Sequence, residues 1–349
     1  MTDTDRYAAF RRQNPTTRIR TAARELGTSE AALVATGVDG EAVRLRPAFE
    51  EILHALQPLG PVMALTRNDA CVHEKTGLYD AVHTGLAHRM GQVLGADIDL
   101  RLFLGRWRFA YAVATPSEGS ADGLRRSLQF FDAHGDAVHK VFCTRKSDLD
   151  AYLALVERFA EAEAAAPETE PRPDPTADRP DAEVDRDALL ADWADLQDTH
   201  DFFQLLGRHR VGRAQALRLG KGRFTTRVAP SAIRETFEAA AASELPIMVF
   251  VGNRGCVQIH TGPVKKLVER GPWYNVLDPG FNLHLDETAV SDSWIVTKPT
   301  EDGDVTALEL YDARGEAVVQ VFGERKPGRP ERPEWRAILE ALSRAEPVA

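Results

Sequence analysis

The chain has 349 residues, of which 43% are hydrophobic and 28% are charged, and its formal net charge is -10. This length is sufficient for two ordinary domains, and the composition is that of a folded globular protein rather than a disordered or collagen-like chain. The acidic balance excludes a general attraction to phosphate backbones or anionic membranes. We therefore expect no nucleic-acid partner.

The N-terminal segment and the cysteines predict a cytoplasmic protein. MTDTDRYAAFRRQNP lacks the apolar core of a signal peptide, and the chain has no run of about 18 apolar residues. Cys71, Cys143 and Cys256 are far apart and odd in number, which leaves neither a CxxC pair nor a complete disulfide framework. We expect neither export nor membrane insertion.

In chain order, the first part of the sequence predicts short helices, then strands, then a closing helix. The predicted elements are a helix, glycine, helix pattern at Ala23–Ala35, a strand pair at Pro61–Gly77, a strand at Asp99–Phe103, one that follows from Trp107, a hairpin at Phe130–Phe142 and a helix at Asp148–Glu163. The hairpin turn DAHG ends in Gly135, where a positive φ costs least. This order is typical of an α+β domain.

A proline-rich and acidic stretch, Ala164–Glu183, interrupts the apolar periodicity and predicts a linker. The sequence after the linker repeats the sequence before it. The matching segments are Gly207–Leu219, Pro246–Gly262, Asn282–Asp286, the strand from Trp294, the hairpin Leu310–Phe322 and the closing helix Pro333–Ala345. Phe131 and Tyr311 are 180 residues apart, whereas Cys71 and Cys256 are 185 apart.

These matches predict a tandem α+β duplication in which each half has helices and a multi-stranded antiparallel sheet. The expected organisation is a first repeat over residues 1–163, a linker over 164–183 and a second repeat over 184–349. Because a junction of two domains can be concave and draw groups from both, we expect a ligand cleft between the halves.

His200 is the candidate ligand residue of the second repeat. Leu189, Trp193, Leu196 and Phe203 follow one face of a helix predicted over Asp187–Gly207, and His200 falls on that apolar stripe. An imidazole among apolar side chains suits a haem face. From the spacing alone, such a histidine is more often a hydrogen-bonded core residue, so both interpretations stay open at this point.

The sequence resembles the bacterial haemin-degrading factors, also described as cytoplasmic haem trafficking proteins, over nearly the whole chain. The motifs that carry the resemblance are RIRTAARELGTSEAALVA, DIDLRLFLGRW, DTHDFFQLLGRHRVGRAQALRLG, NLHL, SWIVTKPT and VQVFGERKPG. The resemblance implies a bound haem (iron protoporphyrin IX), with His200 as the axial ligand of the iron. It also implies that Arg101 faces the other side of the haem, so that the two repeats clamp the ligand.

Further contacts are implied by the same resemblance. Arg213 and Lys298 match positions that anchor the haem propionates, for which fixed cations are suited. The implied polar contacts are Tyr311, Gln320 and Arg325, and the implied ring contacts are Phe103 and Phe250. Without the resemblance, strand phenylalanines are usually core residues and single cations usually lie on the surface.

Three functions remain open at the level of the sequence. The first is haem binding followed by degradation that releases iron, with an external electron donor because no GxGxxG fingerprint follows a strand. The second is a haem chaperone that receives haem from an importer and delivers it to a separate haem oxygenase. The third is a helix-turn-helix DNA-binding regulator, suggested by Ala23–Ala35. The expected oligomeric state is a monomer or a homodimer.

Overall fold

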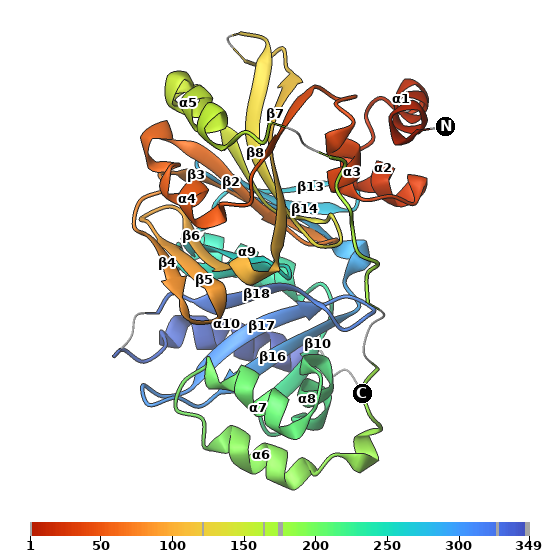
Figure 1. Cartoon of the computed structure of the whole chain (residues 1–349). Coiled ribbons are helices and arrows are strands. Elements are labelled where there is room, and N and C mark those ends of the chain that lie inside the picture. Colours follow the sequence, from red (N-terminus) through yellow and green to blue (C-terminus); the bar gives the residue numbers. More distant parts are fainter. Residues whose placement is uncertain (1, 121, 163–164, 174–176, 326–327, 346–349) are drawn as a thin grey trace. The chain divides into compact units, whose positions relative to one another are not determined.

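The computed structural model of the chain describes residues 2–120, 122–162, 165–173, 177–325 and 328–345. These residues form two compact units whose strands belong to two large antiparallel sheets, as expected for an α+β duplication (Figure 1). Unit 1 consists of Met1–Arg67, Glu74–Pro173 and Gly252–Gln258, and unit 2 consists of Asn68–His73, Asp174–Val251 and Ile259–Ala349.

Unit 1 contains five helices among the described residues: α1 (Asp3–Gln13), α2 (Ile19–Leu26), α3 (Glu30–Ala35), α4 (Phe49–His54) and α5 (Leu149–Phe159). Its strands are β1 (Glu41–Leu45), β2 (Val62–Arg67), β4 (Val82–Leu86), β5 (Met90–Leu94), β6 (Asp99–Phe103), β7 (Trp107–Pro116), β8 (Leu124–Asp132), β9 (Ala137–Cys143) and most of β3 (Cys71–Gly77). The strands pair in the orders β1-β7-β8-β9-β2-β3 and β6-β5-β4.

Unit 2 repeats this arrangement. Its helices are α6 (Arg186–Ala194), α7 (Asp201–His209), α8 (Arg213–Leu219), α9 (Ala232–Ala242) and α10 (Pro333–Ala345). Its strands are β10 (Thr225–Val228), β11 (Ile247–Gly252), β13 (Leu267–Arg270), β14 (Trp273–Asp278), β15 (Phe281–Asp286), β16 (Asp292–Lys298), β17 (Val305–Tyr311), β18 (Ala317–Gly323) and most of β12 (Cys256–Gly262). They pair in the orders β10-β16-β17-β18-β11-β12 and β15-β14-β13.

The two predicted hairpins with a terminal glycine are confirmed. β8 pairs with β9 and β17 pairs with β18, and the turn glycines Gly135 and Gly315 have φ values of 75° and 77°. A residue with a side chain is strained in this left-handed conformation. Glycine at the end of DAHG and DARG therefore permits the turn without strain in both repeats.

Matching rows of side chains cross the two sheets. In unit 1 the paired residues are Arg44, Tyr111, Gln129, Lys140 and Leu65, from β1 to β2. In unit 2 they are Arg227, Trp294, Glu309, Gln320 and Phe250, from β10 to β11. Residues directly opposite on neighbouring strands point to the same face of a sheet. The duplication thus places different side chains on equivalent scaffolds.

The sheet β10-β16-β17-β18-β11 of unit 2 is covered differently on its two faces. Ile295, Leu308 and Val319 pack with α9 and α10 in the larger core. Trp294, Val296 and Tyr311 pack on the other face with residues of α6, α7 and α8, which lie together beside β10 and β16 (Figure 1). The residues Met248, Phe250, Gln320 and Phe322, farther along this second face, are only half-buried.

Each core includes a short segment from the other repeat. Cys256 belongs to the core of unit 1, whereas Ala70 and Cys71 belong to the core of unit 2. The Asn253 side chain ties its segment to unit 1, because Nδ2 donates to the carbonyls of Arg67 and Val138 at 2.9 Å each. Its Oδ1 accepts from the backbone N–H groups of Gly255 and Cys256 at 2.8 and 3.0 Å.

The pattern at Ala23–Ala35 forms α2 and α3, separated by Gly27 with a φ of 65°. In α3, Glu30, Ala31, Leu33 and Val34 are all buried. A recognition helix needs exposed polar side chains to read base edges. The burial of α3 therefore argues against its use as a DNA-reading helix.

The described parts of the predicted linker form no strand and one short 3-10 turn, Asp181–Glu183. The linker nevertheless forms hydrogen bonds with both units. Glu170 N–H donates to the Ala133 carbonyl of unit 1, and the Arg179 carbonyl accepts from Gln215 of unit 2. None of the helices among the described residues is both long enough and apolar enough to cross a bilayer.

We predict that Asn253→Ala lowers the free energy of unfolding by about 2–3 kcal/mol, because two backbone carbonyls and two N–H groups lose a side-chain partner. The measurement is the urea midpoint followed by circular dichroism. Arg254→Ala is the control, since Arg254 is exposed, and it should change the stability by less than about 0.5 kcal/mol. Equal midpoints for both variants would contradict the role of Asn253.

Candidate functional site

The prediction that His200 lies on an apolar stripe of one long helix is wrong. The segment forms two helices, since α6 ends at Ala194 and α7 begins at Asp201, and His200 is the N-cap residue of α7. The Asp198 carboxylate accepts the His200 backbone N–H at 2.8 Å, a local bond that competes with helical pairing. In α7, Phe202 is buried, whereas Phe203 is 81% exposed.

The His200 imidazole is exposed and oriented. Its side chain is 90% accessible, and Nδ1 lies 2.6 Å from Asp198 Oδ1. The pKa of the Asp198 carboxyl is lowered, first by the hydrogen bond from the His200 backbone N–H and also by the charge of Arg325. A carboxylate that holds Nδ1–H leaves Nε2 as the available acceptor nitrogen. His200 and Asp198 thus form one pair, and the charge of Arg325 acts on the Asp198 carboxylate.

A buried ionic network lies beside α7. The Glu309 carboxylate on β17 has no solvent exposure and accepts from Arg213 Nε and Nη2 at 2.9 and 2.6 Å. Lys298 Nζ donates to the same carboxylate at 3.2 Å, and the Tyr311 hydroxyl donates to it as well. The structure therefore brings three of the predicted residues, Arg213, Lys298 and Tyr311, around one carboxylate.

The ionisation of this network follows from burial and charge. Burial alone would raise the pKa of the Glu309 carboxyl, but the charges of Arg213 and Lys298 hold it well below its usual value. Burial lowers the pKa of Lys298 to about 8, although Glu309 partly offsets this effect. Burial also raises the pKa of the Tyr311 phenol, so that this group stays protonated and donates to Glu309.

One aromatic ring, Phe202, contacts both cations of this network. Lys298 Nζ lies 4.7 Å and the Arg213 guanidinium carbon 5.3 Å from the centroid of the Phe202 ring. Phe250 and Gln320 are opposite each other on β11 and β18, and the Phe250 ring lies 5.1 Å from that of Phe322. Unit 2 thus presents an exposed imidazole, an exposed phenyl ring at Phe203 and a half-buried apolar strip.

The two predicted residues of unit 1 lie on β6. Arg101 is about one-third exposed, at 36%, and forms an ion pair with Asp99. The pairing of β4, β5 and β6 aligns His83, Gln92 and Arg101 in one row, and Phe103 is opposite Met90 in the next. The predicted clamp joins Arg101 of unit 1 to His200 of unit 2, and it stays a prediction.

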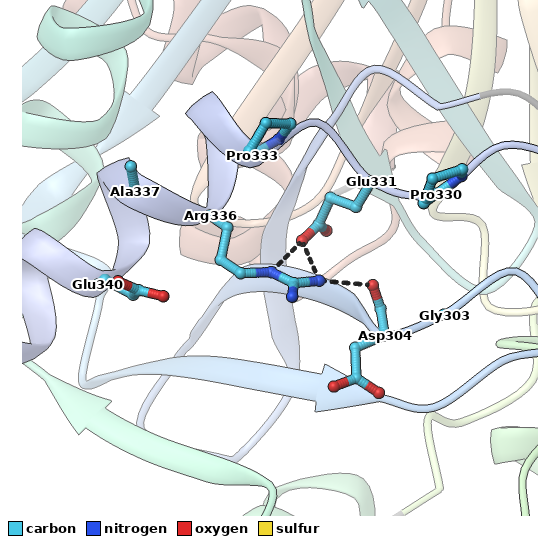
Figure 2. A pocket seen from close by; sticks show the side chains of 8 residues that line it. All are labelled: Gly303, Asp304, Pro330, Glu331, Pro333, Arg336, Ala337 and Glu340. Carbon is cyan, nitrogen blue, oxygen red and sulfur yellow. Dashed lines mark hydrogen bonds and ion pairs between the residues drawn. The ribbon is translucent and has the colours of Figure 1, made fainter.

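A surface hollow beside α10 contains none of the predicted residues (Figure 2). Glu331 accepts from the backbone N–H and the hydroxyl of Thr306 at 2.7 and 2.6 Å, and Arg336 donates to Glu331 and to the Asp304 carbonyl. These charged groups satisfy one another. Over the described part of the chain, no three His, Cys, Asp or Glu side chains gather as a bare metal site.

The sequence interpretation missed Asp198, Glu309 and Phe202. Asp198 has a local signal, because it stands two residues before His200 and a carboxylate at that distance can reach both the backbone and the ring. Glu309 also has a signal, since it is the charged residue in the otherwise apolar and hydroxylic strand VTALELY. Phe202 could not be separated from Phe203 by the helical period, because the helix break changes the phase.

Comparisons with known proteins match both repeats to one family. The family described as "Haemin-degrading HemS.ChuX domain" matches this chain twice, over residues 27–159 and 210–342. The chain is 39% identical to the hemin transport protein HemS of Yersinia enterocolitica, over 99% of this chain and 98% of that protein.

Two solved structures are also similar. The structure of holo-PhuS, a heme-binding protein from Pseudomonas aeruginosa, has a TM-score of 0.92 and 49% identity, with 97% of each chain covered. The heme degrading enzyme ChuS of Escherichia coli O157:H7 has a TM-score of 0.88 and 36% identity, with 97% of this chain and 98% of that chain covered. The double domain match confirms the tandem duplication.

We predict that diethyl pyrocarbonate modifies His200 at least about tenfold faster than His139, which is 1% exposed and needs local opening to react. The rates are measured at neutral pH by mass spectrometry of tryptic peptides under limiting reagent. His139 serves as the internal control, and its rate should rise to that of His200 in urea. Comparable rates in the folded protein would show that the His200 ring is not exposed.

Proposed function

This chain belongs to the haemin-degrading HemS.ChuX family, and we propose that it is a cytoplasmic haem-binding protein in which His200 ligates the haem iron. The observation that carries the proposal is the exposed His200 ring, whose Nδ1 is held by Asp198. Haem iron accepts a neutral imidazole nitrogen, and a carboxylate on the other ring nitrogen fixes the tautomer and increases the basicity of the ligand. Nε2 would be the ligating atom.

The surroundings of His200 fit a porphyrin with two carboxylates. Phe203, Phe250 and Phe322 are exposed or half-buried rings on unit 2, and they would contact the apolar macrocycle. Arg213, Lys298 and Arg325 are cations of unit 2, and Arg213 and Lys298 would meet the propionates. We assign Tyr311 and Gln320 to the polar wall, and Arg101 and Phe103 to the opposite side of the haem.

We further propose that bound haem is degraded and that its iron is released. Haem supplies the iron at which dioxygen reacts, and the electrons come from an external reductant. The similar chain ChuS of Escherichia coli O157:H7 is a heme degrading enzyme, which supports this function. The residues of this chain would hold the ring, orient the imidazole through Asp198 and neutralise the propionates.

The second candidate function is transport without chemistry, favoured by the relative described as a hemin transport protein. In that function the chain receives haem from an importer and delivers it to a separate haem oxygenase. The same side chains would serve both functions, because binding precedes either outcome. A monomer or a homodimer is compatible with each.

We predict that haemin shifts the Soret band in the wild type and that His200→Ala loses this shift and binds at least about tenfold more weakly. The measurement is a spectrophotometric titration of the purified chain. His134→Ala is the matched control, because His134 lies in a hairpin turn of unit 1 and should leave the spectrum unchanged. A variant at His200 with a wild-type spectrum would refute the ligand assignment.

The second prediction separates degradation from transport. With a reductant in air, the Soret band of the haem complex should decay and about one ferrous ion per haem should become chelatable. Under nitrogen the band should persist, since ring opening consumes dioxygen. If the band also persists in air and haem passes intact to an added haem oxygenase, transport is the correct function.

A further inference from the structure

Burial of the Glu309 carboxylate costs free energy, and neighbouring charges and hydrogen-bond donors have to offset that cost. Its carboxylate has no solvent exposure and lies at a central position of the sheet, between Trp294 on β16 and Gln320 on β18. A buried carboxylate is retained as an ion only where cations and donors surround it. Arg213, Lys298 and Tyr311 provide these groups.

The network fixes the plane of the Arg213 guanidinium. Nε and Nη2 both donate to Glu309, which is the two-point geometry that orients an arginine more tightly than a single bond. Nη1 takes no part in these bonds, and the Arg213 side chain is 28% exposed. Glu309 therefore binds one edge of the guanidinium and leaves the Nη1 edge for another anion.

The charges of the network do not cancel. Arg213 and Lys298 are two cations, and over the described part of the chain Glu309 is the one carboxylate that both contact. Both cations also lie on the ring of Phe202, two residues after His200. An excess positive charge, held in a fixed orientation, thus lies against the helix that begins beside the exposed imidazole.

We propose that Glu309 is a positioning residue that orients Arg213, through Nε and Nη2, so that its Nη1 edge receives a haem propionate. This inference rests on the proposed haem binding and assigns a role to a residue that would not itself contact haem. Glu309 acts by pre-organising a cation, which lowers the entropy that the anion must overcome on binding. It also keeps Lys298 charged in a dry site.

The test compares haemin with haemin dimethyl ester, in which both propionates are neutral. Glu309→Gln should bind haemin about tenfold more weakly than the wild type, as expected for one lost charge-assisted bond, and should bind the ester equally well. An effect of the same size on both ligands would mean that Glu309 only supports the fold, and the proposal would be overturned. Unchanged binding of haemin by the variant would overturn it as well.

A second variant tests orientation without removing the buried charge. Arg213→Lys keeps a cation beside Glu309 but loses the two-point geometry, so it should also bind haemin about tenfold more weakly and the ester normally. Wild-type affinity for haemin in Arg213→Lys would show that charge alone is sufficient. This variant decides the question even if Glu309→Gln does not fold.

The pH profile provides an independent measurement. Burial lowers the pKa of Lys298 to about 8 and Glu309 opposes that decrease, so removal of Glu309 lowers it further. Haemin affinity should therefore decline at a lower pH in Glu309→Gln than in the wild type. Superimposed profiles would contradict the proposal, whereas a wild type without a His200-dependent Soret shift would instead refute the proposed haem site.

Discussion

A carboxylate cut off from water in the middle of a β-sheet persists as an ion only if cations reach it. In unit 2 this constraint brings Arg213 of α8 and Lys298 of β16 to Glu309 of β17. Because both cations also contact the Phe202 ring, the position of α7 depends on the same network. The exposed His200 is thus held at the start of a helix whose inner face is fixed by buried charge.

The two repeats share one scaffold, but the ion pair between helix and strand has its charges reversed. Glu30 is the first residue of α3 and pairs with Lys140 on β9, whereas Arg213 is the first residue of α8 and pairs with Glu309 on β17. The strand row that carries Gln129 and Lys140 in unit 1 carries Glu309 and Gln320 in unit 2. Duplication preserved the sheet and the helix while the polar residues diverged, so the repeats need not bind the same ligand.

The sequence was sufficient for the repeated strands and hairpins, because alternating apolar residues and turn glycines act locally. The break between α6 and α7 was not predictable from the helical period, since the Asp198 side chain competes for the backbone there. Arg213, Lys298 and Tyr311 were identified through resemblance, but their common partner Glu309 became visible only when β17 was paired with its neighbours. Long-range pairing of this kind leaves little trace in a single sequence.

The exchange of short segments has a consequence for synthesis on the ribosome. The core of unit 1 includes Cys256, and Asn253 supplies hydrogen bonds to its strands β2 and β9. The first repeat can therefore not complete its core when residue 163 emerges, and it must wait for Gly252–Gln258. Until then the segment Gly252–Gln258 is missing from unit 1. Incompletely packed domains of this kind expose apolar surface and strand edges, which bind chaperones or pair with the wrong strands. Because both repeats belong to one chain, the segment Gly252–Gln258 stays covalently linked to the unit that needs it.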